Sequence, residues 1–221
     1  MSRRMNLFAF LVSVSAFFSL LSSPATAQGT AFKSSLGMAF QGGAVFPSDA
    51  FQDTHAAAGA AFLIPLSPRF HLEFGADYMR IPVRSQAEGL SQGRLTHIPG
   101  LLGLRVRFPL RALPLSPYFS VAAGYAYNAF SLDESAVETY RALGFEVEET
   151  CRSALAAAGG AGVEVILSSK ITIDIRGLYR FSRTSSRWSI SDQVTGNTLS
   201  GTAEDVRLDA IQVTAGLRFF F

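Results

Sequence analysis

The sequence Ile211-Gln212-Val213-Thr214-Ala215-Gly216-Leu217-Arg218-Phe219-Phe220-Phe221 ends the chain, with an apolar residue at every second position. Side chains of a strand alternate between two faces, so one face would carry Ile211, Val213, Ala215, Leu217, Phe219 and Phe221. The other face would carry Gln212, Thr214, Gly216 and Arg218. Soluble strands rarely present an apolar face up to the final carboxylate. We therefore expect the chain to end inside a membrane barrel.

The beginning of the chain has the features of a secretory signal. Arg3 and Arg4 precede an apolar run from Leu7 to Leu21, and Ala25-Thr26-Ala27 follows as a small-x-small cleavage pattern. The apolar run is shorter than the roughly 20 residues that a membrane-spanning helix needs. We expect residues 1–27 to be cleaved and residues 28–221 to form one outer-membrane β-barrel domain. Position 28 is Gln rather than Cys, so no lipoprotein acylation site follows.

The composition of the chain limits the classes of function. Cleavage would remove two of the 19 basic residues and none of the 17 acidic ones, which would leave the two kinds equal in number. No basic patch indicates a nucleic-acid partner. Apolar residues make up 48% of the chain, yet no later stretch is long enough for a transmembrane helix. Alternating strands closed into a barrel combine high hydropathy with short apolar runs.

Eight segments have the period-two alternation of strands, separated by turn residues. We expect strands at residues 35–46, 56–64, 70–79, 96–108, 119–128, 154–167, 171–182 and 211–221. Pro99 lies within the fourth and should disturb local pairing. Long polar loops (47–55, 84–94, 131–151 and 183–205) alternate with short turns (65–68, 109–117 and 168–170). This asymmetry predicts an all-β fold, an eight-stranded antiparallel up-and-down transmembrane β-barrel; a soluble antiparallel sandwich is the alternative.

The polar faces of these strands are expected to point into the barrel. An eight-stranded barrel is just wide enough to be filled by side chains, and charges enclosed there need partners. The predicted lumen charge network consists of Glu73, Asp77, Arg105, Arg107, Glu164, Asp174, Arg176, Arg180 and Arg218. Outward-facing aromatic residues would form two interfacial girdles. Phe70, Phe108, Phe119, Phe219 and Phe221 would lie at the turn end, and Phe46, Tyr78, Tyr127, Tyr179 and Phe181 at the loop end.

Five sequence segments resemble the small eight-stranded outer-membrane barrels of Gram-negative bacteria, the OmpA/OmpX-like outer membrane protein beta-barrel domain. They are residues 95–99, 117–119, 160–164, 171–181 and 216–221. The resemblance implies that Phe219 and Phe221 belong to an assembly signal for the outer-membrane barrel-assembly machinery, with periplasmic chaperones as further partners during biogenesis. It implies an outer-membrane location with periplasmic termini, contact with outer-membrane lipid and lipopolysaccharide, and a monomer.

No motif in the sequence fixes a reaction, a cofactor or a metal site. His71 and His97 would lie on lumen faces as polar filling. His55 follows Ser48, Asp49 and Asp53 in the first loop, and an outer-membrane lipid hydrolase would need such groups near the rim. That enzyme is one alternative, but we expect no catalysis. Cys151 is the only cysteine and is expected to be an unpaired, partly shielded thiol; an intermolecular disulfide is the other option.

Two further features leave the role open. The predicted loop 131–151 has six acidic residues and one arginine, which suits a solvated loop, calcium or a cationic partner. The predicted loop 183–205 carries Arg183, Arg187 and Trp188 near its start, where they could touch lipopolysaccharide phosphates or anchor at the interface. Small lumen-side residues (Ala154, Ala156, Ala158, Gly160 and Gly162) could open a narrow diffusion pore or make room for arginines. We expect a structural or surface-interaction role.

Overall fold

The computed structural model describes residues 35–48, 54–83, 93–110 and 113–221. The chain divides into two compact units, Met1–Phe32 and Lys33–Phe221, and every described residue lies in the second. The predicted signal segment 1–27 and the first-loop residues Asp49 and Asp53 lie outside the described residues. Among the described residues, no helix is long and apolar enough to cross a membrane.

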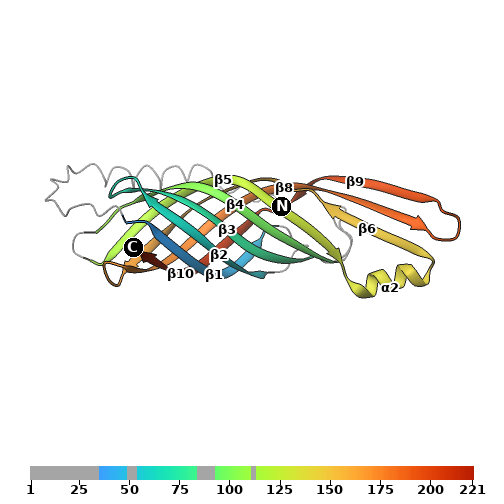
Figure 1. Cartoon of the computed structure of the whole chain (residues 1–221), viewed down its shortest axis with the longest axis horizontal. Helices are drawn as coiled ribbons and strands as arrows, with labels where there is room; N and C mark the ends of the chain where they lie inside the picture. Colours follow the sequence, from blue (N-terminus) through green and yellow to red (C-terminus); the bar gives the residue numbers. More distant parts are fainter. Residues whose placement is uncertain (1–34, 49–53, 84–92, 111–112) are drawn as a thin grey trace, which may run out of the picture. The chain divides into compact units, whose positions relative to one another are not determined.

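Eight antiparallel strands close into a barrel, which confirms the predicted fold class (Figure 1). They are β1 (Gly37–Pro47), β2 (His55–Pro65), β3 (Phe70–Val83), β4 (Gly93–Arg107), β5 (Leu115–Leu132), β7 (Ala154–Ile166), β8 (Ile171–Asp192) and β10 (Ala210–Phe220). The last strand closes the barrel because β10 pairs with β1 on one side and with β8 on the other.

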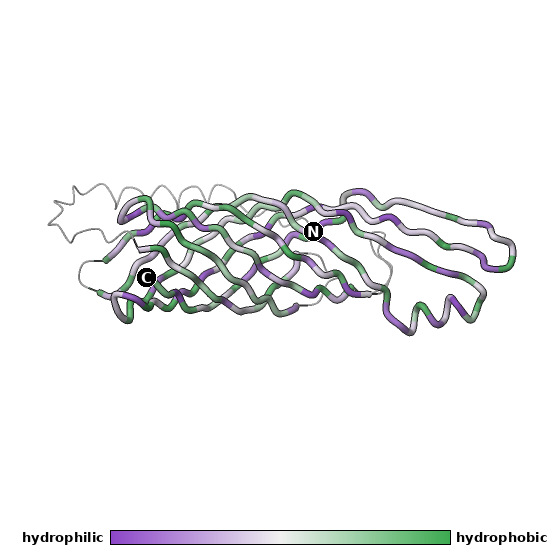
Figure 2. The backbone as a smooth tube through the Cα atoms, in the orientation of Figure 1, coloured by the Kyte–Doolittle hydropathy of each residue, from purple (hydrophilic) through white to green (hydrophobic). Residues whose placement is uncertain are grey.

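Hydrophobic and hydrophilic residues alternate along the barrel strands (Figure 2), and buried and exposed positions alternate with them. In β10, Gln212, Thr214 and Arg218 are buried, whereas Ile211 and Val213 are exposed. Eight of the ten girdle aromatics are exposed on the outside: Phe46, Phe70, Tyr78, Phe119, Tyr127, Tyr179, Phe181 and Phe221. The barrel therefore buries its polar faces and exposes its apolar ones, as lipid requires.

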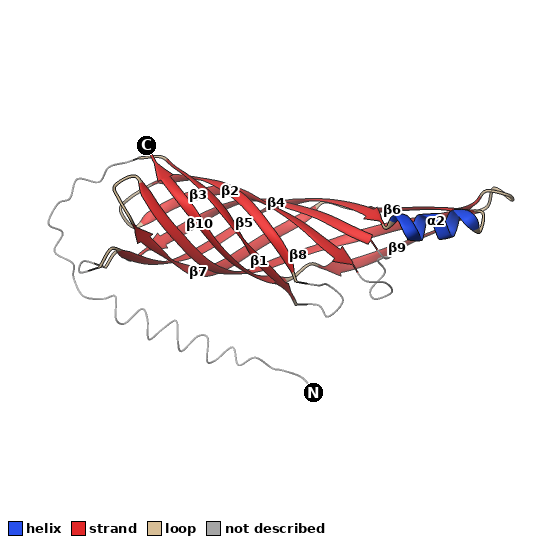
Figure 3. Cartoon of the chain, turned by 90° about the horizontal axis from the view of Figure 1, so that it is seen from below, coloured by secondary structure: helices blue, strands red, loops and turns tan. Residues whose placement is uncertain are grey.

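The two long segments predicted as loops 131–151 and 183–205 are ordered instead. The first contains helix α2 (Glu134–Ala142) and strand β6 (Phe145–Cys151), and the second contains the extension of β8 and strand β9 (Thr198–Arg207). Residues 183–192 of β8 pair with β6 on one side and β9 on the other. Figures 1 and 3 show β6, β9 and α2 beyond one end of the barrel, opposite the end where β10 finishes. We call β6, β9 and residues 183–192 of β8 the extension sheet.

Pro99 coincides with a gap between two strands, as its lack of an N–H group suggests. The register of β3 and β4 includes Ala76 opposite Gly100 and Met79 opposite His97, but no pairs between them. On its other side, Pro99 lies opposite Ala126 of β5 in an unbroken register. The disturbance is therefore local, and the strand continues through the proline.

The tight approach of β4 and β5 generates a test of the barrel. A Cβ at Gly124 would overlap the backbone carbonyl of Gly100, whereas a Cβ at Gly177, which faces outward from β8, would meet nothing within 4 Å. We expect Gly124→Val to lower the free energy of unfolding by about 1–3 kcal/mol through overpacking. Gly177→Val should leave it nearly unchanged. Urea titration of the detergent-folded protein, read by heat-modifiable gel migration, measures both; equal losses would contradict the packing described here.

Candidate functional site

The lumen of the barrel holds two groups of paired charges. The larger group lies toward the turn end and combines Glu73, Glu164 and Asp174 with Arg105, Arg107, Arg176 and Arg218. The smaller group pairs Arg180 with Asp77. All nine predicted lumen residues thus point inward, and the structure brings each of them into at least one ion pair.

Arg105 is the hub of the larger group. Its guanidinium donates to Glu73 and, over 2.9 Å, to Glu164, and it lies 3.9 Å from the ring centroid of Tyr118. Arg105 and Glu164 are both fully buried. Such a pair is costly to remove from water, and multiple charge-assisted hydrogen bonds compensate for that cost.

The other arginines of the larger group connect neighbouring strands to this hub. Arg218 pairs with Asp174 over 2.6 Å and also with Glu164, while Arg107 reaches Glu164 over 2.5 Å. Arg176 links Glu73, over 2.8 Å, to the hydroxyl of Thr214. Side chains from β3, β4, β7, β8 and β10 therefore meet in one network that fills this part of the lumen.

The smaller group lies in the middle of the barrel. Asp77 accepts from Arg180 and, over 2.7 Å, from the amide of Gln41, and Arg180 also donates to Gln212. A cavity of about 40 Å³ between the two groups is lined by Glu73, Asp77, Arg176 and Arg180, among others. It has room for a few water molecules.

The histidines occupy the positions expected of interior residues. His71 and His97 are buried; His97 Nδ1 lies 2.6 Å from the amide oxygen of Asn128, and His71 Nε2 lies 3.3 Å from Arg107. His55 lies at the start of β2. The described residues contain no group of three or more His, Cys, Asp or Glu side chains arranged to hold a metal ion.

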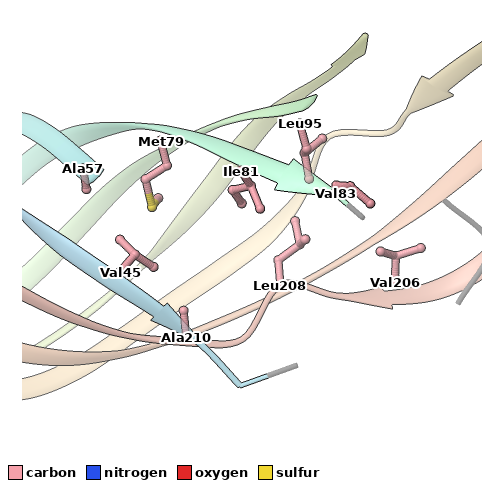
Figure 4. Packing of buried hydrophobic residues seen from close by; sticks show 9 residues of the cluster. All are labelled: Val45, Ala57, Met79, Ile81, Val83, Leu95, Val206, Leu208 and Ala210. Atoms are coloured by element: carbon pink, nitrogen blue, oxygen red, sulfur yellow. The ribbon is translucent and has the colours of Figure 1, made fainter. Parts of the chain in front are cut away.

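An apolar cluster, which the sequence analysis missed, packs inside the barrel at its loop end (Figure 4). It consists of Val45, Ala57, Met79, Ile81, Val83, Leu95, Val206, Leu208 and Ala210. We call it the mouth cluster. Val45 and Met79 continue strand faces that were expected to be polar, and that expectation was wrong at this end. Six other members (Ile81, Val83, Leu95, Val206, Leu208 and Ala210) lie outside the predicted strands. On the outside of β3, β4 and β8 near this level, Arg80, Arg94 and Arg183 are exposed, so the inside and the outside exchange polarity here.

Cys151 lies where the mouth cluster meets the extension sheet, and it is a free thiol. Burial, and next the charge of Glu149, raises the pKa of this thiol to about 11. The hydroxyl of Ser186 donates to the Glu149 carboxylate over 2.7 Å. At neutral pH the thiol is protonated and therefore a weak nucleophile.

Comparison with known proteins agrees with this geometry. Residues 13–219 match the family described as "Outer membrane protein beta-barrel domain". The chain belongs to this family. Members of the family reside in the outer membrane, and so does this chain. No curated protein matches its sequence.

Several solved structures share the fold of this chain at low sequence identity. OprG from Pseudomonas aeruginosa aligns with a TM-score of 0.58 and 17% identity, over 83% of this chain and 95% of OprG. Neisserial surface protein A aligns with a TM-score of 0.54 and 12% identity, over 84% and 97%. A major outer membrane protein from Thermus thermophilus aligns with a TM-score of 0.52 and 11% identity, over 84% and 99%. At these identities the likeness establishes the fold alone.

The buried network generates a prediction about stability. Arg105→Met would leave carboxylates buried without their main partner, so we expect a loss of about 3–5 kcal/mol in the free energy of unfolding. Arg94→Met makes the same chemical change at an exposed position of the same strand and should cost less than about 0.5 kcal/mol. Urea unfolding in detergent micelles measures both. A loss below about 1 kcal/mol for Arg105→Met would contradict a role for the network in stability.

Proposed function

We propose that this outer-membrane protein is a closed, non-catalytic barrel that anchors a surface-interaction element, the extension sheet with helix α2. The main support is the filling of the lumen at two levels. Ion-paired side chains occupy the turn end, and the mouth cluster occupies the loop end. Eight strands leave an interior that side chains can fill, so the barrel suits an anchor better than a channel.

The ordered structure outside the barrel supports the second half of the proposal. Loops that only connect strands need few residues, whereas β6, β9 and the end of β8 form a sheet of their own. Asp192 fixes its hairpin, because its carboxylate accepts from the backbone of Val194, over 2.8 Å, and from the Thr195 hydroxyl, over 2.6 Å. These hydrogen bonds also lower the pKa of Asp192. A rigid surface element loses less entropy on binding than a flexible loop.

An even number of barrel strands brings both chain ends to the side of the short turns, and outer-membrane barrels have their short turns on the periplasmic side. Both chain ends would then lie in the periplasm and the extension sheet would face the cell exterior, near lipopolysaccharide. We propose that Phe219 and Phe221, at the end of β10, act as the signal for the barrel-assembly machinery, and that the folded protein is a monomer. The nine charges of the lumen network act structurally in this proposal.

The closed lumen predicts the absence of a conducting path. In planar bilayers, the purified protein should give no discrete conductance steps, and liposomes that contain it should swell in isosmotic sugar no faster than empty ones. A porin of known conductance serves as the positive control. Steps that change in size with Glu73→Gln would overturn the closed barrel in favour of a narrow pore.

A non-catalytic role predicts that the lipid composition of the membrane is the same with and without the protein.

The orientation predicts a labelling pattern on intact cells. Val194 is 87% exposed at the tip of the β8–β9 hairpin. In a Cys151→Ser background, Val194→Cys should react with a membrane-impermeant maleimide at pH 7 on intact cells. Native Cys151 should react far more slowly, because its raised pKa keeps the thiol protonated. Labelling of Val194→Cys only after the outer membrane is permeabilised would reverse the orientation.

A further inference from the structure

The extension sheet has one apolar and one polar face. Register partners in an antiparallel sheet share a face, so Val147, Ile190 and Leu199 form a row across all three strands. Phe145 and Trp188 lie on the same face, and we call these five residues the apolar sheet face. Glu149, opposite Trp188, and Asp192, opposite Phe145, share this face. The opposite face carries Glu146, Glu148, Arg187 and the hydroxyl residues Thr150, Ser189, Ser191, Thr198, Ser200 and Thr202.

The apolar sheet face continues the inner wall of the barrel, and part of it is exposed. Further along β6 and β9, Cys151 and Ala203 pack against the mouth cluster, where the opposite wall of the barrel covers them. Beyond that level Leu199 is 65% exposed and Phe145 is 37% exposed. Val147, Trp188 and Ile190 are half-buried. Exposed apolar surface of this kind, rimmed by polar residues, marks interaction sites in proteins.

The turns at the far end of the sheet extend this surface. The backbone N–H of Gln193 donates to the carbonyl of Gly144 over 2.9 Å, which ties the β8–β9 hairpin to the start of β6. Leu143 and Val194 flank this contact and are 66% and 87% exposed. A hydrogen-bonded scaffold thus holds several uncovered apolar side chains in fixed positions.

The charges around this surface select the occupant. Residues 133–151, which contain α2 and β6, include six acidic residues and one basic residue. Glu134 and Glu138 of α2 are exposed, and Glu146 and Glu148 are exposed on the opposite face of the sheet. An acidic rim repels anionic lipid and a second copy of the same surface, and it attracts cations.

We propose that the apolar sheet face, with its acidic rim, binds a basic amphipathic protein segment. Apolar side chains of the partner would cover Leu199, Ile190 and Phe145, while its lysines or arginines would pair with the exposed glutamates of α2. The inference rests on the proposed surface-interaction function and specifies the chemistry of the partner.

Trp188 gives a direct readout of this site because it is the only tryptophan of the chain. The full protein is placed in phosphatidylcholine nanodiscs and titrated with a tryptophan-free, 12-residue amphipathic peptide of Leu and Lys. We expect a saturable blue shift of Trp188 emission that weakens as salt is raised. The same peptide with Glu in place of Lys, and vesicles containing phosphatidylglycerol, should leave the emission unchanged.

Variants then test which residues are responsible. Leu199→Ser with Val194→Ser should weaken peptide binding at least tenfold, and so should Glu134→Lys with Glu138→Lys. Leu113→Ser is the matched control, since Leu113 is a comparably exposed leucine (54%) outside the extension sheet. Heat-modifiable migration checks that every variant folds.

The outcomes separate this inference from the proposed function. No emission change with the Lys peptide, or an equal change with the Glu peptide or the anionic vesicles, would overturn the inference. Concentration-dependent self-association that Leu199→Ser abolishes would also overturn it, in favour of a second copy. The proposed function fails on different results, namely conductance steps or labelling of Val194→Cys only from the periplasmic side.

Discussion

The pairing of β10 with both β1 and β8 is the constraint on which the rest of this structure depends. Lipid offers no hydrogen bonds to a strand edge, so a sheet that spans a membrane has to close on itself. Closure of eight strands encloses a lumen that side chains largely fill. The arginines and carboxylates of the lumen faces consequently satisfy one another, and Arg105 of β4 donates to carboxylates of β3 and β7. The network follows from closure.

The change from lipid to water around the barrel explains why the polarity of its inner and outer surfaces reverses near the mouth. At the level of Tyr78 and Phe181 the outside is apolar and the lumen is polar. A few residues further on, Arg80 and Arg183 are exposed on the outside, and Ile81 and Leu95 are buried inside. Where water replaces lipid around the barrel, the interior becomes an ordinary apolar core, as in a soluble protein.

The sequence predicts the barrel well because lipid imposes period two on every strand. It also predicts which charges face inward, since Arg176 and Arg180 lie an even number of positions from Asp174 and therefore on the same face of β8. It does not predict the partners, because the meeting of Arg105 with Glu164 depends on register across the closed sheet. Tyr118 was missed as a lumen residue although its parity matches Ser120. The extension of β8 was missed because its Ser- and Thr-rich alternation has no lipid-facing apolar residues and resembles a loop. The mouth cluster was missed because six of its nine residues lie outside the predicted strands, so that no face was assigned to them.

The same change of solvent accounts for both the mouth cluster and the apolar sheet face. Strands β1 to β4 end near the mouth, so their inward side chains meet those of β9 and β10 and exclude water. Strand β8 continues for a further ten residues with β6 and β9 beside it. Trp188 and Ile190 lie on the face of β8 that, earlier in the strand, points into the barrel. The inner side of the extension sheet is apolar and partly exposed, so this sheet is incomplete as a core. That incompleteness distinguishes the extension sheet from a passive loop, and the acidic residues around it determine which partner can complete it.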